Sequence, residues 1–334
     1  MRVWLNPAWQ LESADGTVTF QGEKKKYVLD DGKGTVSRLL EALVGGCENA
    51  ALEALTRRDP ECAGLVRALR KRGLLIESPS GPAGDDSVHA RQWGHLALHT
   101  HRPDEAQRRI CGAKVMVMGV GGTGSVILQH LIGAGVRRFV LVDADKVQLN
   151  NLNRQFTFPR AAVGEPKLDA ARTYIRDRVP DADISLVDRF VGSPAEICEV
   201  LETHANVDVI AVCIDQPIGS ISDAVAEAAW ARNIPSIFGG VGMQRGFYGP
   251  LFAPGRSTVT PEQLSFPVRA DAAPENDAGN LRSTRYSFGP NNTIVGAWMA
   301  AAIIHHLAGI TELVEYDARK IIDFETGNII AQAQ

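Results

Sequence analysis

The sequence has 334 residues, of which 45% are hydrophobic, and carries a formal net charge of −4. This composition predicts a globular chain of two or three domains and gives no argument for nucleic acid or a membrane surface as a partner. The first ten residues lack the apolar core of a secretory signal. The longest apolar run, 293–304, is too short to span a bilayer and predicts a buried helix. The five cysteines are scattered, which favours a reduced cytoplasmic protein.

The first 77 residues predict a small α+β domain. Three short stretches predict strands from their apolar and β-branched residues, and three longer stretches have the apolar spacing of helices. The strands are expected at 2–6, 17–21 and 25–30, and the helices at 35–46, 49–57 and 61–77. This set of elements resembles the winged-helix element that recognises precursor peptides in peptide natural-product biosynthesis.

That resemblance implies how a peptide would bind. A leader segment of the precursor would add as a strand beside the third strand and lie against the third helix, so that backbone hydrogen bonds supply affinity. The basic stretch RALRKRG keeps a DNA-binding winged helix open as an alternative, and a purely structural cap is another. The residues expected to contact the peptide are Tyr27, Val28, Leu29, Leu65, Leu69 and Arg72.

A change of composition marks the boundary between two domains. Residues 78–90 are small, polar and interrupted by proline and glycine, which predicts a linker. Residues 91–334 alternate strands and helices and predict a Rossmann-like α/β domain with a mostly parallel sheet. Within it, 254–284 has few large apolar residues and is expected to form a long mobile loop.

A glycine-rich turn opens the second domain. The apolar run 114–118 predicts a buried strand, Gly119, Gly121 and Gly124 then fit the pattern G-x-G-x-x-G, and an apolar helix follows. Glycine lets the backbone approach a phosphate, and the helix N-terminus offers free N–H groups with a partial positive charge. Asp143 ends the next strand, where a carboxylate can bind ribose hydroxyls. The pattern therefore predicts a nucleotide site.

The residues after Asp143 favour a triphosphate. The loop DADKVQLNNLNRQF contains three asparagines and an arginine, Lys167 follows it, and a later buried strand ends on Asp215. A dinucleotide pyrophosphate is satisfied largely by backbone N–H groups, whereas a triphosphate needs Arg, Lys and usually Mg²⁺ held by a carboxylate. Arg154, Lys167 and Asp215 would supply these groups, so we expect ATP and Mg²⁺. An NAD dehydrogenase, which uses the same glycine pattern, is the weaker alternative.

These motifs resemble the ThiF/MoeB-type adenylating domain that ubiquitin-activating enzymes share with bacterial enzymes of the molybdopterin and thiamin pathways. The matching stretches are GVGGTG, DAD, NNLNRQ, GEPK and CIDQ, and Asn150 stands where the family usually has serine. The resemblance implies that Asp143 binds the ribose, with Asp145 nearby. The full set of implied nucleotide contacts is Gly119, Gly121, Gly122, Gly124, Asp143, Asp145, Asn150, Gln155 and Gln216.

The same resemblance implies catalytic roles. Asn151 and Arg154 would bind the β- and γ-phosphates, and Lys167 would reach the α-phosphate. Asp215 would hold Mg²⁺. Arg91, upstream of the first strand of this domain, would enter the site of a partner subunit, which implies a homodimer. The two C-x-x-C pairs that bind zinc in many relatives are missing, so no structural zinc is expected.

Over nearly its whole length, the sequence is most similar to the adenylating enzymes of microcin C and pantocin biosynthesis. The stretches 238–255 and 288–307 fit the strands and the late helix of that group. The expected reaction is adenylation of a carboxylate, at the C-terminus or on an Asp or Glu side chain, of a ribosomally made precursor peptide. A nucleophile would then capture the acyl-adenylate. Activation of a ubiquitin-like or sulfur-carrier protein is the main alternative, and a non-catalytic peptide-presenting scaffold is another.

Overall fold

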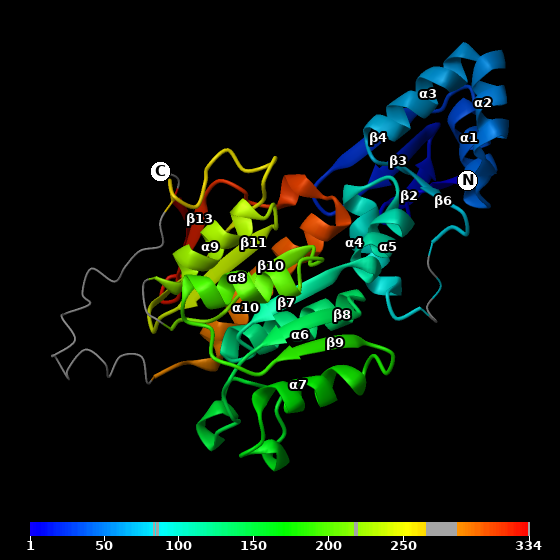
Figure 1. The fold of residues 1–334 in the computed structure, drawn as a ribbon. Helices are drawn as coiled ribbons and strands as arrows, with labels where there is room; N and C mark the ends of the chain where they lie inside the picture. Colours follow the sequence, from blue (N-terminus) through cyan, green and yellow to red (C-terminus); the bar gives the residue numbers. More distant parts are fainter. Residues whose placement is uncertain (83, 85–86, 217–219, 265–285, 333–334) are drawn as a thin grey trace. The chain divides into compact units, whose positions relative to one another are not determined.

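The structure, a computed structural model, describes residues 1–82, 84, 87–216, 220–264 and 286–332. It divides into two compact units, Met1–Arg109 and Ile110–Gln334 (Figure 1). The boundary falls inside helix α5 (Pro103–Gly112). Among the described residues, no helix combines the length and the apolar character that crossing a bilayer requires.

The first unit contains two small antiparallel sheets, with the strand orders β5-β1-β6 and β2-β3-β4. Its apolar core joins Val18 and Phe20 of β3 to side chains of α1, α2 and α3, such as Leu43, Leu52 and Leu69. The strands are β1 (Arg2–Leu5), β2 (Gln10–Ala14), β3 (Thr17–Gln21), β4 (Lys26–Asp30), β5 (Cys47–Glu48) and β6 (Leu75–Ser78). The helices before α5 are α1 (Thr35–Val44), α2 (Asn49–Arg58), α3 (Pro60–Lys71) and α4 (Ala90–His99).

The predicted third helix of this unit is too long. Instead of continuing to residue 77, α3 ends at Lys71, and Gly73 follows with a φ of 70°. Glycine adopts this left-handed conformation without strain and commonly ends a helix. The chain then enters β6, which pairs with β1 along Leu75–Ser78. Strand β2 was not predicted, because its five residues are all exposed and give little apolar signal.

The first unit also extends beyond the predicted boundary at residues 77–91. The buried side chains of Ile76, Trp93 and Ala97 pack together with Trp4. The side-chain amide of Asn6 donates hydrogen bonds to the carbonyl oxygens of Gly73 and Ala97, at 2.8 Å and 2.6 Å. These contacts attach α4 to the sheet of β1, so the structural boundary differs from the one that composition indicates.

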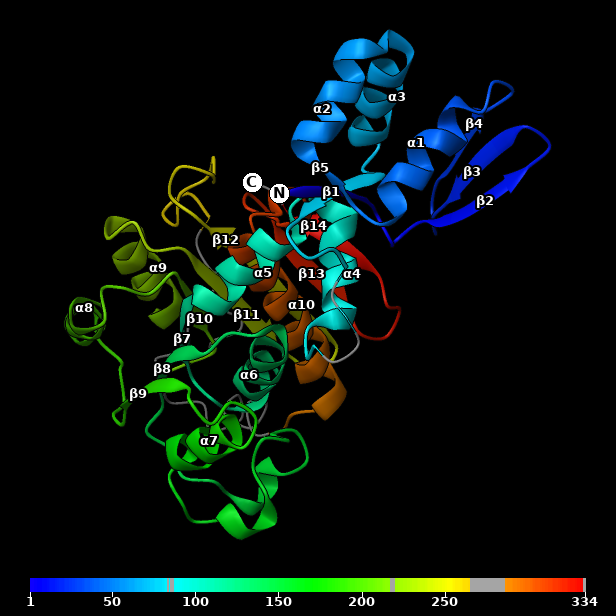
Figure 2. The ribbon, with the colours of Figure 1, turned by 90° about the vertical axis from the view of Figure 1, so that its right-hand side faces the viewer.

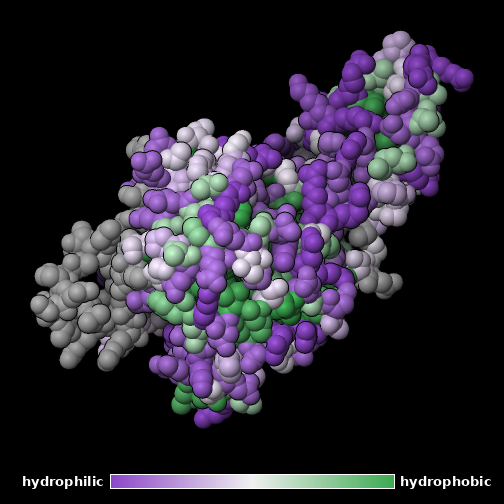
Figure 3. Space-filling view, viewed as in Figure 1, coloured by the Kyte–Doolittle hydropathy of each residue, from purple (hydrophilic) through white to green (hydrophobic). Residues whose placement is uncertain are grey.

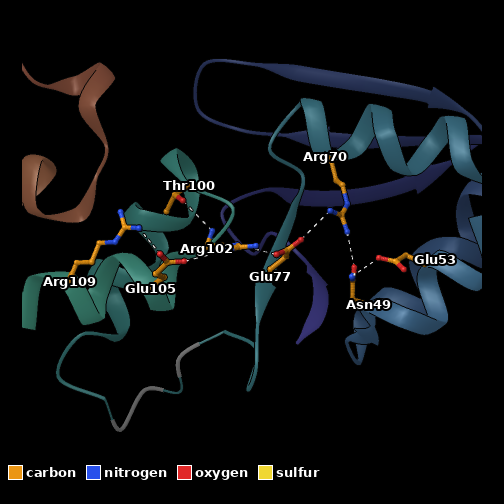
Figure 4. Close-up of polar contacts among 8 residues, drawn as sticks. All are labelled: Asn49, Glu53, Arg70, Glu77, Thr100, Arg102, Glu105 and Arg109. Carbon is orange, nitrogen blue, oxygen red and sulfur yellow. Dashed lines mark hydrogen bonds and ion pairs between the residues drawn. The ribbon is translucent and has the colours of Figure 1, made fainter. Parts of the chain in front are cut away.

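Charged side chains link β6 to α3 and to the start of α5 (Figure 4). The carboxylate of Glu77, on β6, accepts hydrogen bonds from Arg70 at 3.1 Å and from Arg102 at 3.2 Å. Arg102 and Arg109 both pair with Glu105 on α5. Because the Glu77 side chain is only 13% exposed, water screens these two bonds less than it screens a surface ion pair.

The second unit is built on one eight-stranded sheet with the order β14-β13-β12-β11-β10-β7-β8-β9. The five strands from β11 to β9 are parallel, and β12, β13 and β14 are antiparallel. This confirms the predicted α/β fold with a mostly parallel sheet. The strands are β7 (Lys114–Met118), β8 (Arg138–Val142), β9 (Asp183–Val187), β10 (Val209–Val212), β11 (Ser236–Val241), β12 (Arg245–Phe252), β13 (Arg319–Asp323) and β14 (Ile329–Gln332).

Helices cover both faces of this sheet (Figure 2). One face packs against α8 and α9, whose apolar residues share a core with Met116, Val140 and Ile210. Helices α6 and α10 pack against each other and contact β7 and β11. The predicted apolar helix around 293–304 is confirmed as part of α10. The helices are α6 (Gly122–Ala134), α7 (Lys167–Arg176), α8 (Pro194–Thr203), α9 (Ile221–Ala231) and α10 (Gly289–Ala308).

The predicted mobile loop, 254–284, is described only as far as Leu264; residues 265–284 lie outside the described residues. The described part consists of turns. Asp317 accepts hydrogen bonds from the backbone N–H groups of Thr258 and Val259.

The order of the strands creates a crevice between β7 and β10. From β7 the chain proceeds outward through β8 and β9, and then returns to the other side of β7 with β10. Helices leave the sheet in opposite directions at such a point, so the carboxyl ends of the two strands border an open space. Gly119 follows β7 and lies so close to Cys213, which follows β10, that a Cβ on Gly119 would be 2.8 Å from the Cys213 carbonyl oxygen.

Candidate nucleotide-binding site

A cavity of about 820 Å³ opens at this crevice. It lies where the loops after four parallel strands meet, which is where ligands bind in open α/β sheets. Nine of the predicted residues line the cavity: Gly119, Gly121, Gly122, Asp143, Asp145, Arg154, Lys167, Asp215 and Gln216. Gly124, Asn150, Asn151 and Gln155 are not among its lining residues.

The glycines of the glycine turn, residues 119–124, serve two different purposes. Gly119 has a φ of 88°, and Gly121 precedes the first turn of α6. Gly124 lies inside the helix, where a Cβ would overlap the carbonyl oxygen of Gly119. Gly124 therefore allows the close approach of helix and strand, and Gly119, Gly121 and Gly122 face the cavity.

Asp143 links the glycine turn to the loop after β8. Its carboxylate accepts hydrogen bonds from the backbone N–H of Val120 at 2.8 Å and of Asp145 at 2.9 Å. Burial raises the pKa of Asp143, and the ammonium group of Lys167, 3.9 Å away, opposes that rise. The carboxylate is thus fixed in position at the edge of the cavity, as a ligand for sugar hydroxyls would need to be.

Lys167 is a buried cation at the start of α7. The residue is 6% exposed, and its Nζ lies 2.6 Å from Asp145 Oδ2, whose side chain is 71% exposed. An ammonium group with two carboxylates and a cavity beside it can exchange one partner for a phosphate oxygen at little desolvation cost.

The asparagine loop, residues 148–155, is stabilised by hydrogen bonds within the loop and places Arg154 at the cavity. Asn151 accepts a hydrogen bond from the N–H of Gln148 at 3.0 Å and donates one to the side chain of Asn150 at 3.1 Å. In this structure Asn151 therefore caps a turn, and its predicted phosphate contact stays a prediction. Arg154 reaches the cavity and donates to the Asn150 carbonyl and the Asn153 side chain. Burial lowers the pKa of Arg154.

Gln155 lies directly behind the glycine turn. It is 3% exposed, its Oε1 has no hydrogen-bond partner in the described part of the chain, and its Nε2 would be 3.6 Å from a Cβ on Gly121. Its predicted nucleotide contact stays a prediction.

Asp215 and Gln216 follow β10, and both are exposed residues that line the cavity. Within the described residues there is no group of three acidic, histidine or cysteine side chains that could enclose a metal ion. Mg²⁺ commonly binds one or two carboxylates and completes its shell with water and substrate phosphates. Asp215, an exposed carboxylate on the wall of a cavity of about 820 Å³, fits that mode of binding.

Sequence reasoning missed several segments that line the cavity. Arg189, Phe190 and Val191 follow β9, and the rule that strand ends gather at one edge could have found them. The β11–β12 hairpin, the N-terminal turn of α10 and the end of β13 carried no motif that marks a binding site, although 238–255 and 288–307 resembled a known group in their fold. Their lining residues are Gly239, Gly240, Val241, Gly242, Met243, Gln244, Arg245, Tyr286, Ser287, Asn292, Asp323 and Glu325.

The start of α10 contacts both the glycine turn and the asparagine loop. Asn292 is 6% exposed, and its amide nitrogen donates to the Ser287 hydroxyl and to the Phe288 carbonyl. Its Oδ1 lies where a Cβ on Gly122 would be, and a Cβ on Gly289 would be 2.7 Å from the carbonyl oxygen of Asn153. The helix therefore holds the glycine turn and the asparagine loop together.

The predicted peptide-contacting residues lie in the first unit. Strand β4 is at the edge of the β2-β3-β4 sheet, Val28 is 56% exposed on it, and the flanking Tyr27 and Leu29 pack against the core. The guanidinium of Arg72 lies over the ring of Tyr27 at 5.5 Å, which brings the end of α3 beside this strand. Leu65 is partly buried against the core.

Leu69 was expected to line an open groove, and that expectation is wrong. Its side chain has no exposed surface and belongs to the core of the first unit.

Arg91 is an exposed residue in the first turn of α4. Its predicted role in a partner's site stays a prediction.

A family model and curated proteins match the second half of this description. The model of the ThiF family matches residues 94–332. An adenylyltransferase and sulfurtransferase from Aspergillus terreus is 30% identical over 185 residues, which cover 50% of this chain and 37% of that protein. The molybdopterin-synthase adenylyltransferase of Escherichia coli is 29% identical over 135 residues, covering 40% and 52% of the two chains. The chain thus spans about a third to a half of the length of these curated relatives.

Solved structures match over the whole chain. MccB from Escherichia coli, solved with ATP, has a TM-score of 0.76 at 20% identity, with 100% of this chain and 96% of that chain covered. PaaA has a TM-score of 0.72 at 20% identity, with 98% of each chain covered. At this level of identity the likeness shows the fold alone.

Proposed function

This chain belongs to the ThiF family, and from that premise we propose that it is an ATP-dependent adenylyltransferase acting on a carboxylate of a precursor peptide. The observation that carries the proposal is the convergence of Asp143, Arg154, Lys167 and Asp215 on one cavity at the sheet's crevice. Asp143, Arg154 and Lys167 lie between the end of β8 and the first residue of α7, and Asp215 follows β10. Their charges suit a ribose, a polyphosphate and a cation in that one space.

In the proposed reaction the chain binds and orients its substrates. Asp143 accepts hydrogen bonds from the ribose, and the N–H groups at the start of α6 face the phosphates. Lys167 exchanges Asp145 for an α-phosphate oxygen, and Arg154 neutralises the phosphates that leave as pyrophosphate. A substrate carboxylate attacks the α-phosphorus, the bond from that phosphorus to the bridging oxygen breaks, and an acyl-adenylate forms. The rate gain comes from positioning and charge neutralisation, so no covalent residue is required.

Asp215 is the residue that would hold Mg²⁺ in this scheme. The ion, when bound, neutralises phosphate charge as pyrophosphate leaves.

The substrate carboxylate would approach from the β11–β12 hairpin. Gly239, Gly240 and Gly242 line that end of the cavity without side chains. A Cβ at Gly240 would collide with the Phe247 ring, and one at Gly242 would be 2.9 Å from the Arg245 carbonyl oxygen. This wall of bare backbone suits an extended peptide segment, whose own N–H and C=O groups need partners.

The first unit supports a peptide as the substrate. Strand β4 is an edge strand whose exposed Val28 and neighbouring Tyr27 offer backbone and apolar contacts to an added strand. MccB has been solved in complex with N-formylated MccA, and it has the same fold as this chain. Activation of a ubiquitin-like or sulfur-carrier protein is the second candidate, favoured by the curated relatives.

Two further parts belong to the proposal. The enzyme would act as a homodimer in which Arg91 of one subunit enters the site of the other. It would act in the cytoplasm, because all five cysteines, which lie in the described part of the chain, are free thiols.

The test is ATP–pyrophosphate exchange with a synthetic precursor peptide. The peptide and Mg²⁺ should both be required, and NAD should not bind. Asp215→Ala should abolish exchange, with circular dichroism unchanged, and Glu227→Ala, which removes an exposed acid on α9 outside the cavity, is the control. Full exchange by Asp215→Ala would contradict the metal assignment, and exchange with a sulfur-carrier protein but no peptide would favour the second candidate.

A further inference from the structure

Strand β4 has one unpaired side, and the hydrogen-bond register shows which groups face it. The N–H of Gly22 donates to the Lys25 carbonyl at 2.9 Å, and the N–H of Asp31 donates to the Gly16 carbonyl at 2.7 Å. Between them β3 and β4 are in regular antiparallel register, with Thr19 opposite Val28. Hydrogen-bonded and non-hydrogen-bonded pairs alternate along such a ladder.

This alternation shows which residues of β4 bond to β3 and which have backbone groups that point away from it. Tyr27 and Leu29 bond to β3, so the N–H and C=O groups of Lys26, Val28 and Asp30 point away from it. In the strand order β2-β3-β4, no described strand takes up those groups. An extended segment of about five residues could pair with all three positions.

The two ends of this edge differ in charge. At the β3–β4 hairpin, Lys24, Lys25 and Lys26 are consecutive exposed residues. Arg72, from the end of α3, joins them over the ring of Tyr27. At the other end, Asp30 accepts a hydrogen bond from the N–H of Gly32.

Asp31, the other acid at that end, is held by hydrogen bonds to the start of α1. Asp31 accepts bonds from the N–H groups of Val36 and Ser37 and from the Ser37 hydroxyl, and these bonds lower its pKa. Among the ion pairs of the described residues, none involves Lys24, Lys25 or Lys26. The positive charge at the hairpin end is therefore available to a partner.

We infer that the partner strand on β4 is a leader segment with an acidic residue opposite Lys26, apolar residues opposite Tyr27, Val28 and Leu29, and a polar or basic residue opposite Asp30. Directly opposed side chains on one face of a sheet interact, and opposite charges there stabilise the pair. This inference rests on the proposed function, and it specifies the chemistry of the peptide.

The same lysines could attract nucleic acid, but the surrounding charge disfavours it. The sheet segment 10–31 holds three lysines and five acidic residues, so its net charge is −2. A long polyanion would meet all five acids, whereas a single carboxylate opposite Lys26 would meet only Glu23 of the hairpin, which three lysines outweigh. Outward-facing strand amides and an exposed Val28 also match a peptide backbone better than a duplex.

The experiment is a selection from a random twelve-residue peptide display library with the full-length protein. Peptides that also bind the Val28→Pro variant, which lacks one outward N–H, are removed. The remaining peptides should share an acid followed by apolar residues. The opposite order, apolar residues followed by an acid, is also expected, because an added strand can run parallel or antiparallel to β4. Bound peptides should lose about five- to tenfold in affinity when that acid becomes the amide, or when Lys26→Gln is tested.

The control variant is Lys33→Gln, an exposed lysine beyond the strand, which should leave peptide affinity unchanged. Selected peptides without an acid would overturn the inference and leave peptide recognition standing. Failure to recover any peptide that depends on Val28 would overturn both. A labelled 20-base-pair duplex that binds the protein and is lost on Lys26→Gln, with no peptide recovered, would identify the hairpin as a nucleic-acid contact.

Discussion

The ammonium group of Lys167, on a residue that is 6% exposed, lies 2.6 Å from the carboxylate of Asp145, whose side chain is 71% exposed. The pair thus joins the interior of the second unit to the surface of the cavity. Asp143, at 3.9 Å, is the second acid within reach of the same cation.

Removing Lys167 should therefore affect both catalysis and stability. Lys167→Ala should lower pyrophosphate exchange by roughly 100-fold or more, as loss of a group that stabilises transition-state charge does. It should also destabilise the fold by about 1–3 kcal/mol, because Asp143 stays buried without its cation. Lys146→Ala, an exposed lysine on the same loop, is the control for both measurements. Normal exchange by Lys167→Ala would remove this residue from the mechanism.

The glycines of α6 provide a matched pair of substitutions. Gly124→Ala should abolish ATP binding and lower the melting temperature, because the new Cβ would overlap the Gly119 carbonyl oxygen. Gly133→Ala, later in the same helix, meets nothing within 4 Å and should stabilise the protein by about 0.5–1 kcal/mol. Calorimetry with ATP and thermal unfolding measure both effects. Equal ATP affinity for Gly124→Ala and the wild type would contradict the assignment of the turn.

Phe190 is expected to stack on the nucleotide base. Its side chain is 57% exposed and lines the cavity, and a Cβ on Gly192 would collide with its ring, so the ring has a close neighbour on one side. Stacking of a base on an aromatic ring contributes about 1–3 kcal/mol. Phe190→Ala should raise the KM for ATP roughly tenfold with little change in kcat. Phe156→Ala, which is 58% exposed outside the cavity, should change neither, and an unchanged KM for Phe190→Ala would place the base elsewhere.

His306 should make the protein sensitive to mild acid. Burial, and to a smaller extent Arg256, lowers the pKa of His306 from 6.5 to about 4. The unfolded chain therefore takes up the proton first, so stability falls as the pH drops below about 6.5 and continues to fall until about 4. Between pH 7 and pH 5 the loss should be about 2 kcal/mol.

Urea unfolding at the two pH values measures that loss. For His306→Gln, the difference in the free energy of unfolding between the two pH values should be smaller by about 2 kcal/mol. The exposed His130 serves as the comparison, since His130→Gln should keep the pH dependence of the wild type. Identical pH dependence for His306→Gln and the wild type would rule out His306 as the source.

Sharing of sites between subunits can be tested by complementation. An Arg91→Ala chain and a Lys167→Ala chain should each be inactive alone and regain activity when mixed, since one site of the mixed dimer has both residues intact. Verified mixed dimers without activity would count against an arginine supplied by the partner.

The sequence predicted one wall of the cavity, the one that includes Gly119, Asp143 and Lys167, and missed the opposite wall, for a physical reason. Phosphates demand particular residue types at fixed spacing after a strand, so Gly119, Asp143 and Lys167 are recognisable in one dimension. The β11–β12 hairpin contributes three glycines and the side chains from Met243 to Arg245, and their positions depend on strand register. A linear pattern contains no information about that register.

Two errors in the first unit have a similar origin. Leu69 falls on the same helical face as Leu65, but the position of the core decides that Leu69 is fully buried. The apolar residues after Gly73 continue the pattern of a helix, and only the pairing of β6 with β1 makes them a strand. In both cases contacts between distant segments outweigh the local signal.

The packing of Trp93 against Ile76 and Ala97 limits how the first unit could be exchanged between ThiF-family proteins. A crossover at residues 78–90 would separate the indole of Trp93, which is 3% exposed, from Ile76 and Trp4. A transferable module must therefore include α4, and with it Arg91. Any recombination event that replaces the β2-β3-β4 sheet would also replace Arg91, so the proposed peptide specificity and the proposed shared arginine should be inherited together.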